Sequence, residues 1–276
     1  MTLEIDRLRQ THDWSKPFFT DELNPLWFRS SNSQSISTAY SDEHAATRAE
    51  LDQASWWYQT RNRIICDAVE HLGSRTLWDV GSGTGIVARA LTKAGWKVVG
   101  IEPSVEGSRR TARHGMETFC GTLDQVGLPD ESLEAVSLFD VLEHVDNREA
   151  LLKEIRRVLR VGGVLLVTVP AIQLLWSQFD IDEGHRLRYR KSSLRRELSD
   201  AGFHVSRIGY FFVLGVLPLM LLRAVPFRLG INRPMSDMHE VSVRLEKLGP
   251  IASWFERRIA LRAPLGSSLM AIAQKC

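Results

Sequence analysis

The sequence predicts an α/β fold in which a mostly parallel sheet is covered by helices on both faces. After Gly73, short apolar runs alternate with amphipathic helical segments, an alternation typical of βαβ units. The chain has 276 residues, of which 44% are hydrophobic and 25% charged, enough to bury one substantial core. We therefore expect one domain over residues 51–276, preceded by an N-terminal arm over residues 1–50.

The apolar runs predict strands, and the periodic segments between them predict helices. Ser30–Thr38 is rich in Ser, Asn and Gln without an apolar period, as in a loop. A helical pattern begins near Glu50 and continues to Val69. Strands are expected at Thr76–Val80, Lys97–Ile101, Glu117–Cys120, Ala135–Phe139, Val164–Val169, Phe203–Tyr210 and Ser267–Gln274. Helices are expected to begin near Thr84, Ser104 and Asp146 and to cover Lys191–Ala201.

The segment 210–262, between the last two strands, is longer than a hairpin needs and is expected to be a helical, partly apolar insertion. It contains Tyr210–Leu222, thirteen residues without a charge, which as a helix would be about 20 Å long and too short to cross a bilayer core of about 30 Å. Glu183–Arg262 holds 15 Lys and Arg against 7 Asp and Glu. An apolar helix in a basic segment suits peripheral contact with an anionic membrane surface or a lipid-like ligand; packing on the sheet edge or a dimer interface is the alternative.

Other partners and compartments are constrained by composition. Phe211 and Phe212 lie in an apolar run and are not interleaved with Lys or Arg, which disfavours nucleic-acid binding. The three cysteines are far apart and lack the spacing of a disulfide framework or a zinc site. The N-terminus carries charges where a secretory signal needs an apolar core. A cytoplasmic protein, with contact to the membrane surface through 210–262, is therefore expected.

The stretch Leu77–Leu91 reads LWDVGSGTGIVARAL, a glycine loop between an expected strand and an expected helix. Its spacing is G-x-G-x-G, and Ile86 stands where a dinucleotide-binding loop has its third glycine. Asp79 would repel a pyrophosphate but can accept hydrogen bonds from an ammonium group. Glu102, at the end of the second strand, can accept both hydroxyls of a ribose, as NAD or an adenosyl ligand would require. Pro103 and Ser104 offer no cation for a 2′-phosphate, which disfavours NADP.

Four motifs in order resemble those of class I S-adenosylmethionine-dependent methyltransferases. They are DVGSGTG, VVGIEPS, FDVLEHV and LLKEIRRVLRVGGVLLVTVP, which begin at Asp79, Val98, Phe139 and Leu151. The resemblance covers about Trp56–Tyr210 and the terminal strand. It implies a Rossmann-like, seven-stranded sheet with six parallel strands and an antiparallel last strand inserted beside the fifth. It also implies S-adenosylmethionine as the cofactor and a small molecule as the methyl acceptor.

The resemblance implies cofactor-binding roles for specific residues. Asp79 and the loop formed by Gly81, Ser82, Gly83 and Gly85 would hold the methionine end, and Glu102 with Pro103 the ribose. Gly121, Thr122 and Leu123 would flank the adenine, where the family often has an acid and this chain has Asp124 one residue displaced. Phe139 and Asp140 would face the sulfonium. Trp57 and Arg61 complete the expected set, with core packing as the alternative for Trp57.

Two histidines are candidates for catalysis, because a methyl transfer needs a base only where the acceptor must lose a proton. They are His144, just past the fourth strand, and His185, in the loop after the fifth; a purely structural role is the alternative for each. Asp140, Glu143 and His144 resemble the metal-binding segment of small-RNA 2′-O-methyltransferases and quinone O-methyltransferases, with Asp where those enzymes have Glu. We assign no metal ligand from the sequence.

The expected function is methyl transfer to an oxygen or nitrogen of a small, hydrophobic or lipid-linked acceptor. Two alternatives stay open. One is a metal-assisted RNA 2′-O-methyltransferase, and the other is a non-catalytic scaffold that binds an adenosyl ligand.

Overall fold

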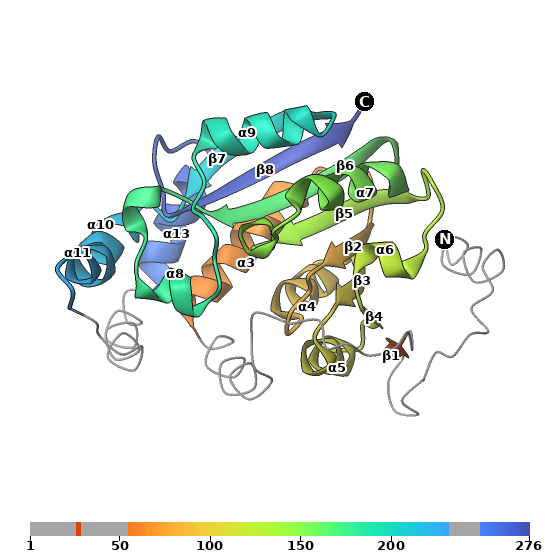
Figure 1. Cartoon of the computed structure of the whole chain (residues 1–276), viewed down its shortest axis with the longest axis horizontal. Helices are drawn as coiled ribbons and strands as arrows, with labels where there is room; N and C mark the ends of the chain where they lie inside the picture. The colour runs from red at the N-terminus through yellow and green to blue at the C-terminus, as the bar shows by residue number, and fades with distance from the viewer. Residues whose placement is uncertain (1–25, 29–54, 232–248) are drawn as a thin grey trace.

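The computed structural model of the protein describes residues 26–28, 55–231 and 249–276, which form a sheet layered between helices (Figure 1). The strands are β1 (Leu26–Phe28), β2 (Thr76–Val80), β3 (Lys97–Glu102), β4 (Glu117–Cys120), β5 (Leu133–Phe139), β6 (Leu159–Pro170), β7 (Phe203–Phe211) and β8 (Ser268–Lys275). They are ordered β1-β4-β3-β2-β5-β6-β8-β7. β8 lies antiparallel between β6 and β7, and the other pairs are parallel.

All seven strands expected from the sequence are present, and β8 lies beside the fifth of them as the resemblance implies. β1 is an addition. It lies within the segment predicted as an arm and extends the sheet by pairing with β4 in parallel. Three residues are too few for a period-2 pattern to stand out in a sequence, and the pairing that makes them a strand is long-range. The rest of the predicted arm, including Ser30–Thr38, lies outside the described residues.

Helices cover both faces of the sheet, as predicted. They are α3 (Trp56–Val69), α4 (Ile86–Lys93), α5 (Val105–Arg113), α6 (Leu123–Val126), α7 (Arg148–Val158), α8 (Gln178–Asp182), α9 (Lys191–Asp200), α10 (Val216–Leu219), α11 (Val225–Arg228) and α13 (Gly249–Ile259), with short turns η1 (Leu142–His144), η2 (Gln173–Leu175) and η3 (Met220–Ala224). One core cluster joins the sheet to α6, α7 and α9, and a second joins it to α3 and α4. The first five residues of the predicted 50–69 helix lie outside the described residues, and Ser55 caps α3 at its N-terminus.

The predicted helix at Tyr210–Leu222 is wrong in its first part. Tyr210 and Phe211 are the end of β7, where they pair with Leu269 and Ser268, and a helical course begins only at Val216. Phe212 adopts a positive φ of 59° between the two elements, and its side chain is buried. An uninterrupted apolar run does not distinguish a buried strand from a helix, and here the run contains the end of one and the start of the other.

From α10 the chain continues through η3, a π-helical turn, into α11. Pro226 lacks the N–H that an α-helix would need at that point, and the π turn ends at Ala224, two residues before it. Among the described residues, no helix has the length and apolar character needed to span a membrane.

Candidate functional site

The glycine loop follows β2 and is bound to the end of β3. The N–H groups of Gly81 and Ser82 both donate to the Ile101 carbonyl, at 2.7 and 3.2 Å. Gly85 caps α4 with a left-handed backbone, φ 76°, and a Cβ there would lie 2.9 Å from the Thr111 Cα. The alternate glycines therefore serve the turn and the close approach of α5, which leaves the loop backbone at the carboxyl edge of the sheet.

Asp79 is a buried acid at the end of β2. Its Oδ1 accepts a hydrogen bond from the Ser137 hydroxyl at 2.7 Å, and the residue is only 2% exposed. Burial raises the pKa of Asp79 to about 7, against the opposing effects of the Ser137 hydrogen bond and the Arg61 charge. A cationic ligand beside this carboxylate would favour its charged form.

Glu102 joins the glycine loop to the start of α5. Its Oε2 accepts from the Gly83 N–H at 2.7 Å, and its Oε1 accepts from the Ser104 N–H at 2.8 Å. Burial raises the pKa of Glu102, and these two backbone donors oppose the shift. Gly107 makes the arrangement possible, because a Cβ at that position would lie 2.9 Å from the Glu102 Cγ and from the Gly83 carbonyl. An ionised carboxylate has about four acceptor positions, so Glu102 retains capacity for ligand hydroxyls.

The segment expected near an adenine follows β4, beside Glu102. Gly121 donates its N–H to the Glu102 carbonyl at 3.0 Å, and Thr122, the N-cap of α6, donates its N–H to Gln125 Oε1 at 2.9 Å. Leu123 points its side chain into the core, where it is 2% exposed, so a ligand can meet only its backbone. Pro103 is half-buried. Asp124 is exposed on α6.

Arg61 crosses from α3 to the end of β5. Its Nη2 lies 2.6 Å from Asp140 Oδ2, and the Thr168 hydroxyl donates to Asp140 Oδ1 at 3.0 Å. Asp140 itself has a positive φ of 56°, a conformation that costs a non-glycine residue energy and that is concentrated at functional sites. Both Asp140 oxygens are thus bound by protein groups, which sets this residue apart from the metal-binding segment it resembles in sequence.

Two expected cofactor-binding residues pack mainly against the protein. Phe139 is 6% exposed and belongs to the core cluster under α3 and α4. The Trp57 ring stacks on the Phe212 ring with centroids 3.6 Å apart. This contact places Trp57 against the chain that enters the 210–262 insertion.

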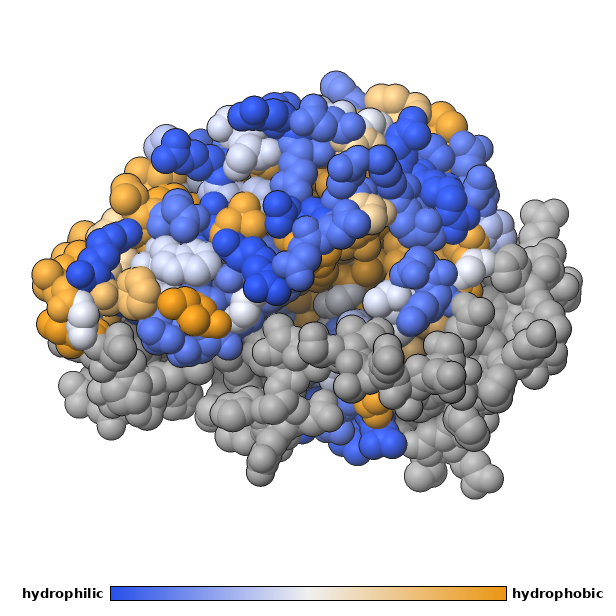
Figure 2. All heavy atoms as spheres, viewed as in Figure 1, coloured by the Kyte–Doolittle hydropathy of each residue, from blue (hydrophilic) through white to orange (hydrophobic). Residues whose placement is uncertain are grey.

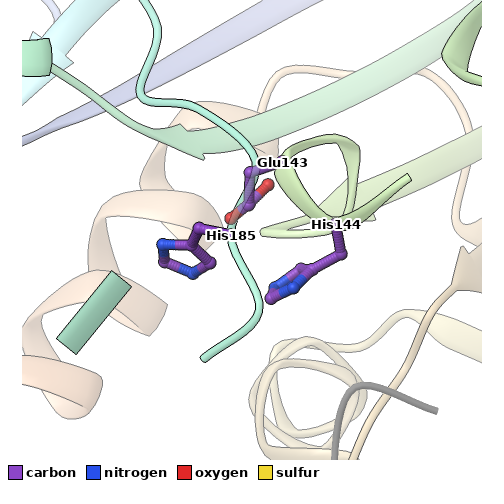
Figure 3. A group of neighbouring side chains, drawn as sticks. All are labelled: Glu143, His144 and His185. Atoms are coloured by element: carbon purple, nitrogen blue, oxygen red, sulfur yellow. The ribbon is translucent and has the colours of Figure 1, made fainter. Parts of the chain in front are cut away.

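The two candidate histidines are neighbours, although 41 positions separate them in the numbering. Their ring centroids are 4.8 Å apart, with His144 on η1 and His185 in the loop after α8. Figure 3 shows the two rings with the Glu143 carboxylate beside them. Burial and the nearby His185 lower the pKa of His144 to about 4, so its ring is neutral at physiological pH.

A buried acid, Asp180, orients His185. The His185 Nδ1 lies 2.9 Å from Asp180 Oδ1, and the ring nitrogen is the donor because an ionised carboxylate can only accept. Arg188 Nε donates to the same oxygen at 2.7 Å, and the Ser177 N–H donates to Oδ2 at 2.9 Å. Although burial raises it, the hydrogen bond from His185 and the charge of Arg188 hold the pKa of Asp180 below its usual range. Nε2 is therefore the His185 nitrogen left for chemistry.

Glu143 is fully buried beside the two histidines. Among the described residues, neither of its carboxylate oxygens has a hydrogen-bond partner. Burial, with a smaller contribution from Asp140, raises the pKa of Glu143 well above its usual range. Glu143, His144 and His185 each offer one ligand atom, and these atoms lie within 4.8 Å of one another (Figure 3). An unpartnered buried carboxylate is costly, and a cation or a ligand donor would satisfy it.

Sequence reasoning missed several residues that complete this site. Ser137 and Thr168 lie inside strands, and nothing local distinguishes them. Asp180 had a readable signal, because Ser177 and Asp180 form a capping box at the start of α8. Gly107 and Thr111 fix the approach of α5 to the glycine loop, which only the packed structure reveals.

Comparison with known proteins identifies the family and the fold. The sequence model of a family described as a methyltransferase domain matches residues 56–207. A probable S-adenosylmethionine-dependent methyltransferase of Mycolicibacterium smegmatis is 26% identical over 61% of this chain and 68% of its own length. A ubiquinone biosynthesis O-methyltransferase of Bradyrhizobium is 27% identical over 39% of this chain and 44% of its own length, so that match is partial on both sides.

A solved structure shares the fold. It is an S-adenosylmethionine-dependent methyltransferase of Thermotoga maritima, described as a possible histamine N-methyltransferase, with a TM-score of 0.56 and 18% identity over 85% of this chain and 96% of its own. At that identity the likeness concerns the arrangement of the sheet and its helices.

Proposed function

Because the chain belongs to the methyltransferase-domain family, whose model covers more than half of it, we propose that it moves the methyl group of S-adenosylmethionine to an oxygen of a small, hydrophobic or lipid-linked acceptor. S-adenosylmethionine as methyl donor follows from the family and from the four sequence motifs. The acceptor is the new part of the proposal. The observation that carries it is the Asp180–His185 pair at the carboxyl edge of the sheet.

The proposed cofactor cradle runs along that edge. Asp79 and the Gly81–Gly85 backbone bind the methionine end, and Glu102 binds the ribose. The Gly121–Leu123 segment flanks the adenine through its backbone and Thr122, with Pro103 beside it. Arg61 neutralises Asp140 and is near enough to Asp79 to influence its charge. Phe139 and Trp57 support the cradle by packing.

An oxygen acceptor fits the histidine pair better than a neutral amine does, because a neutral amine can attack the methyl group without first losing a proton to a base. In the transfer, the bond between sulfur and the methyl carbon breaks as a bond from acceptor oxygen to that carbon forms. A hydroxyl must give up its proton, and His185 Nε2 is positioned to receive it while Asp180 stabilises the resulting imidazolium. The products are a methyl ether and S-adenosylhomocysteine. The likeness to a ubiquinone biosynthesis O-methyltransferase supports a hydroxyl on a lipid-linked molecule.

A divalent cation is a second candidate for activating the hydroxyl, and one observation favours it. Both Glu143 oxygens are buried without a hydrogen-bond partner among the described residues, and one of them lies within 4.8 Å of a nitrogen of each histidine. One carboxylate and two imidazoles form a donor set that suits zinc, iron or manganese better than magnesium. A bound cation would lower the pKa of a coordinated hydroxyl. Asp180 would then hold His185 in the orientation that a metal ligand requires.

The acceptor is tested by comparing two matched probes with the purified full chain. An alkyl catechol and an alkylamine of the same chain length are incubated with S-adenosylmethionine carrying a labelled methyl group. We expect label on the catechol oxygen and none on the amine. Methylation of the amine alone would contradict the oxygen assignment. Methylation of a short RNA would favour the RNA alternative, and cofactor binding without transfer to any probe would favour the scaffold.

The pKa of Asp79 predicts how cofactor affinity depends on pH. With the free-state pKa near 7, binding a ligand ammonium requires an ionised carboxylate, so affinity falls as pH drops below about 7, approaching tenfold per pH unit. Calorimetry with S-adenosylhomocysteine, which carries the same ammonium, measures this. The Asp79→Asn variant lacks this titration, while Glu102 titrates in both proteins and divides out, so the ratio of wild-type to variant affinity should itself fall as the pH drops below about 7. A ratio that does not change with pH would remove Asp79 from the ammonium site.

A further inference from the structure

The helical course from α10 to α11 carries an apolar face that points away from the protein. Leu217, Leu221 and Leu229 are 65%, 56% and 70% exposed, and Val225 lies between them in the same every-fourth-residue series. The π-helical turn at 220–224 holds more residues per turn than an α-helix, so side chains four apart stay closer to one line. Figure 2 shows apolar surface gathered at the end of the molecule where α10 and α11 lie.

This apolar face adjoins the wall of the methyl-transfer site. The Arg223 guanidinium lies 4.5 Å over the Phe179 ring of α8, and Arg228 Nη2 donates to the Leu174 carbonyl at 2.7 Å. Leu174 is itself 62% exposed. α8 leads directly into the loop of His185, so the outward face and the histidine pair are carried by elements in contact.

The exposed charges within the described part of 210–262 are of one sign. Within the described part of 210–262, Glu256 is the only acid, and it is fully buried, where it accepts hydrogen bonds from the N–H groups of Val213 and Leu214. Arg228, Arg258 and Arg262 are exposed. Trp254 on α13 is 60% exposed with the Arg258 guanidinium 5.4 Å from its ring, a pairing of aromatic and cation that suits a lipid headgroup region.

We propose that the α10–α11 face docks on the surface of an anionic lipid bilayer. Exposed leucines enter the boundary between headgroups and acyl chains, and the arginines meet the anionic headgroups. A second copy of the chain is a poorer occupant, because an isologous contact would set the same arginines against one another. The surface lies outside the methyl-transfer site, so docking stands or falls independently of the proposed reaction.

The test is co-flotation of the full chain with vesicles of phosphatidylcholine alone or mixed with phosphatidylserine. We expect binding to the mixed vesicles, weakening as salt is raised. The double variant Leu217→Glu, Leu221→Glu should lose about tenfold or more of this binding. Val161→Glu is the matched control, because Val161 is 64% exposed at the start of β6, away from this face, and it should bind as the wild type does.

Each contrary outcome is distinguishable. Unaltered thermal unfolding of the double variant shows that it folds, as expected for side chains already in solvent. No binding to either vesicle, or equal binding by wild type and double variant, overturns the proposal. The proposal is also overturned if the wild type is a dimer in solution and the double variant is a monomer, because a second copy would then cover the face.

Discussion

Replacing His185 by alanine is expected to lower kcat for the hydroxyl acceptor by about 10²- to 10⁴-fold, the usual contribution of a positioned general base. Cofactor affinity should change little, because the contacts of His185 are to Asp180 and the neighbouring rings and not to the glycine loop. Single-turnover rates with the acceptor, measured beside calorimetry with S-adenosylhomocysteine, separate the two effects.

His204→Ala is the matched control, since His204 is exposed on β7 and remote from the site in the sheet order. It should leave both measurements unchanged. Asp180→Asn tests positioning, because the amide cannot stabilise an imidazolium as a carboxylate does. We expect kcat to fall while KM for the acceptor changes little. A His185→Ala enzyme with kcat within threefold of wild type, on the order expected of a merely structural side chain, would exclude the histidine from the chemistry.

The same variants distinguish a base from a cation. If His185 acts alone, a chelator leaves the wild-type rate unchanged and Glu143→Gln has a small effect. If Glu143, His144 and His185 hold a cation, the chelator abolishes transfer, zinc or manganese restores it, and Glu143→Gln reduces the rate as severely as His185→Ala. Metal content of the purified chain, measured directly, gives a readout that does not depend on activity.

The fold was largely predictable because its signals are local or follow from general rules of α/β sheets. Apolar runs such as Val164–Val169 and the glycine loop stand out in the sequence, and parallel strands bring their carboxyl ends to one edge. That rule and the family resemblance together predicted that Asp79, Glu102 and Asp140 share one edge of the sheet. Where a prediction was wrong or a residue was missed, the structure or role of that residue depends on long-range contacts. Tyr210 is a strand residue because it pairs with Leu269, and Ser137 matters only because β5 lies beside β2.

The histidine pair shows both sides of this limit. The sequence marked His144 and His185 separately, one just past the fourth strand and the other in the loop after the fifth, and the fold brought their rings to 4.8 Å. The sequence grouped Glu143 with Asp140, its neighbour in the motif. In the folded chain Asp140 is taken by Arg61, and Glu143 is grouped with a histidine 42 positions away in the numbering. Spacing within a motif did not indicate which acid would be left without a partner.

Replacing Glu102 by alanine is expected to weaken cofactor binding by about 1.5–3 kcal/mol, the usual worth of hydrogen bonds to a charged group, or roughly 10- to 100-fold in Kd. The variant removes the acceptor proposed for the ribose hydroxyls. Calorimetry with S-adenosylhomocysteine gives the value directly. Glu106→Ala is the control, because Glu106 is a nearby glutamate on α5 whose partner is Arg110. Tight binding of NAD by the wild type would contradict the choice of ligand altogether.

Glu102 also binds the N–H groups of Gly83 and Ser104, so a loosened loop could weaken binding without any loss of ribose contact. A cycle with the 2′-deoxy analogue of S-adenosylhomocysteine separates these causes. If Glu102 accepts the ribose hydroxyls, removing the 2′-hydroxyl weakens binding to the wild type and has little further effect on Glu102→Ala. If the carboxylate only shapes the loop, the analogue loses the same affinity for both proteins. The coupling between variant and analogue therefore measures the contact itself, independent of how far the loop relaxes.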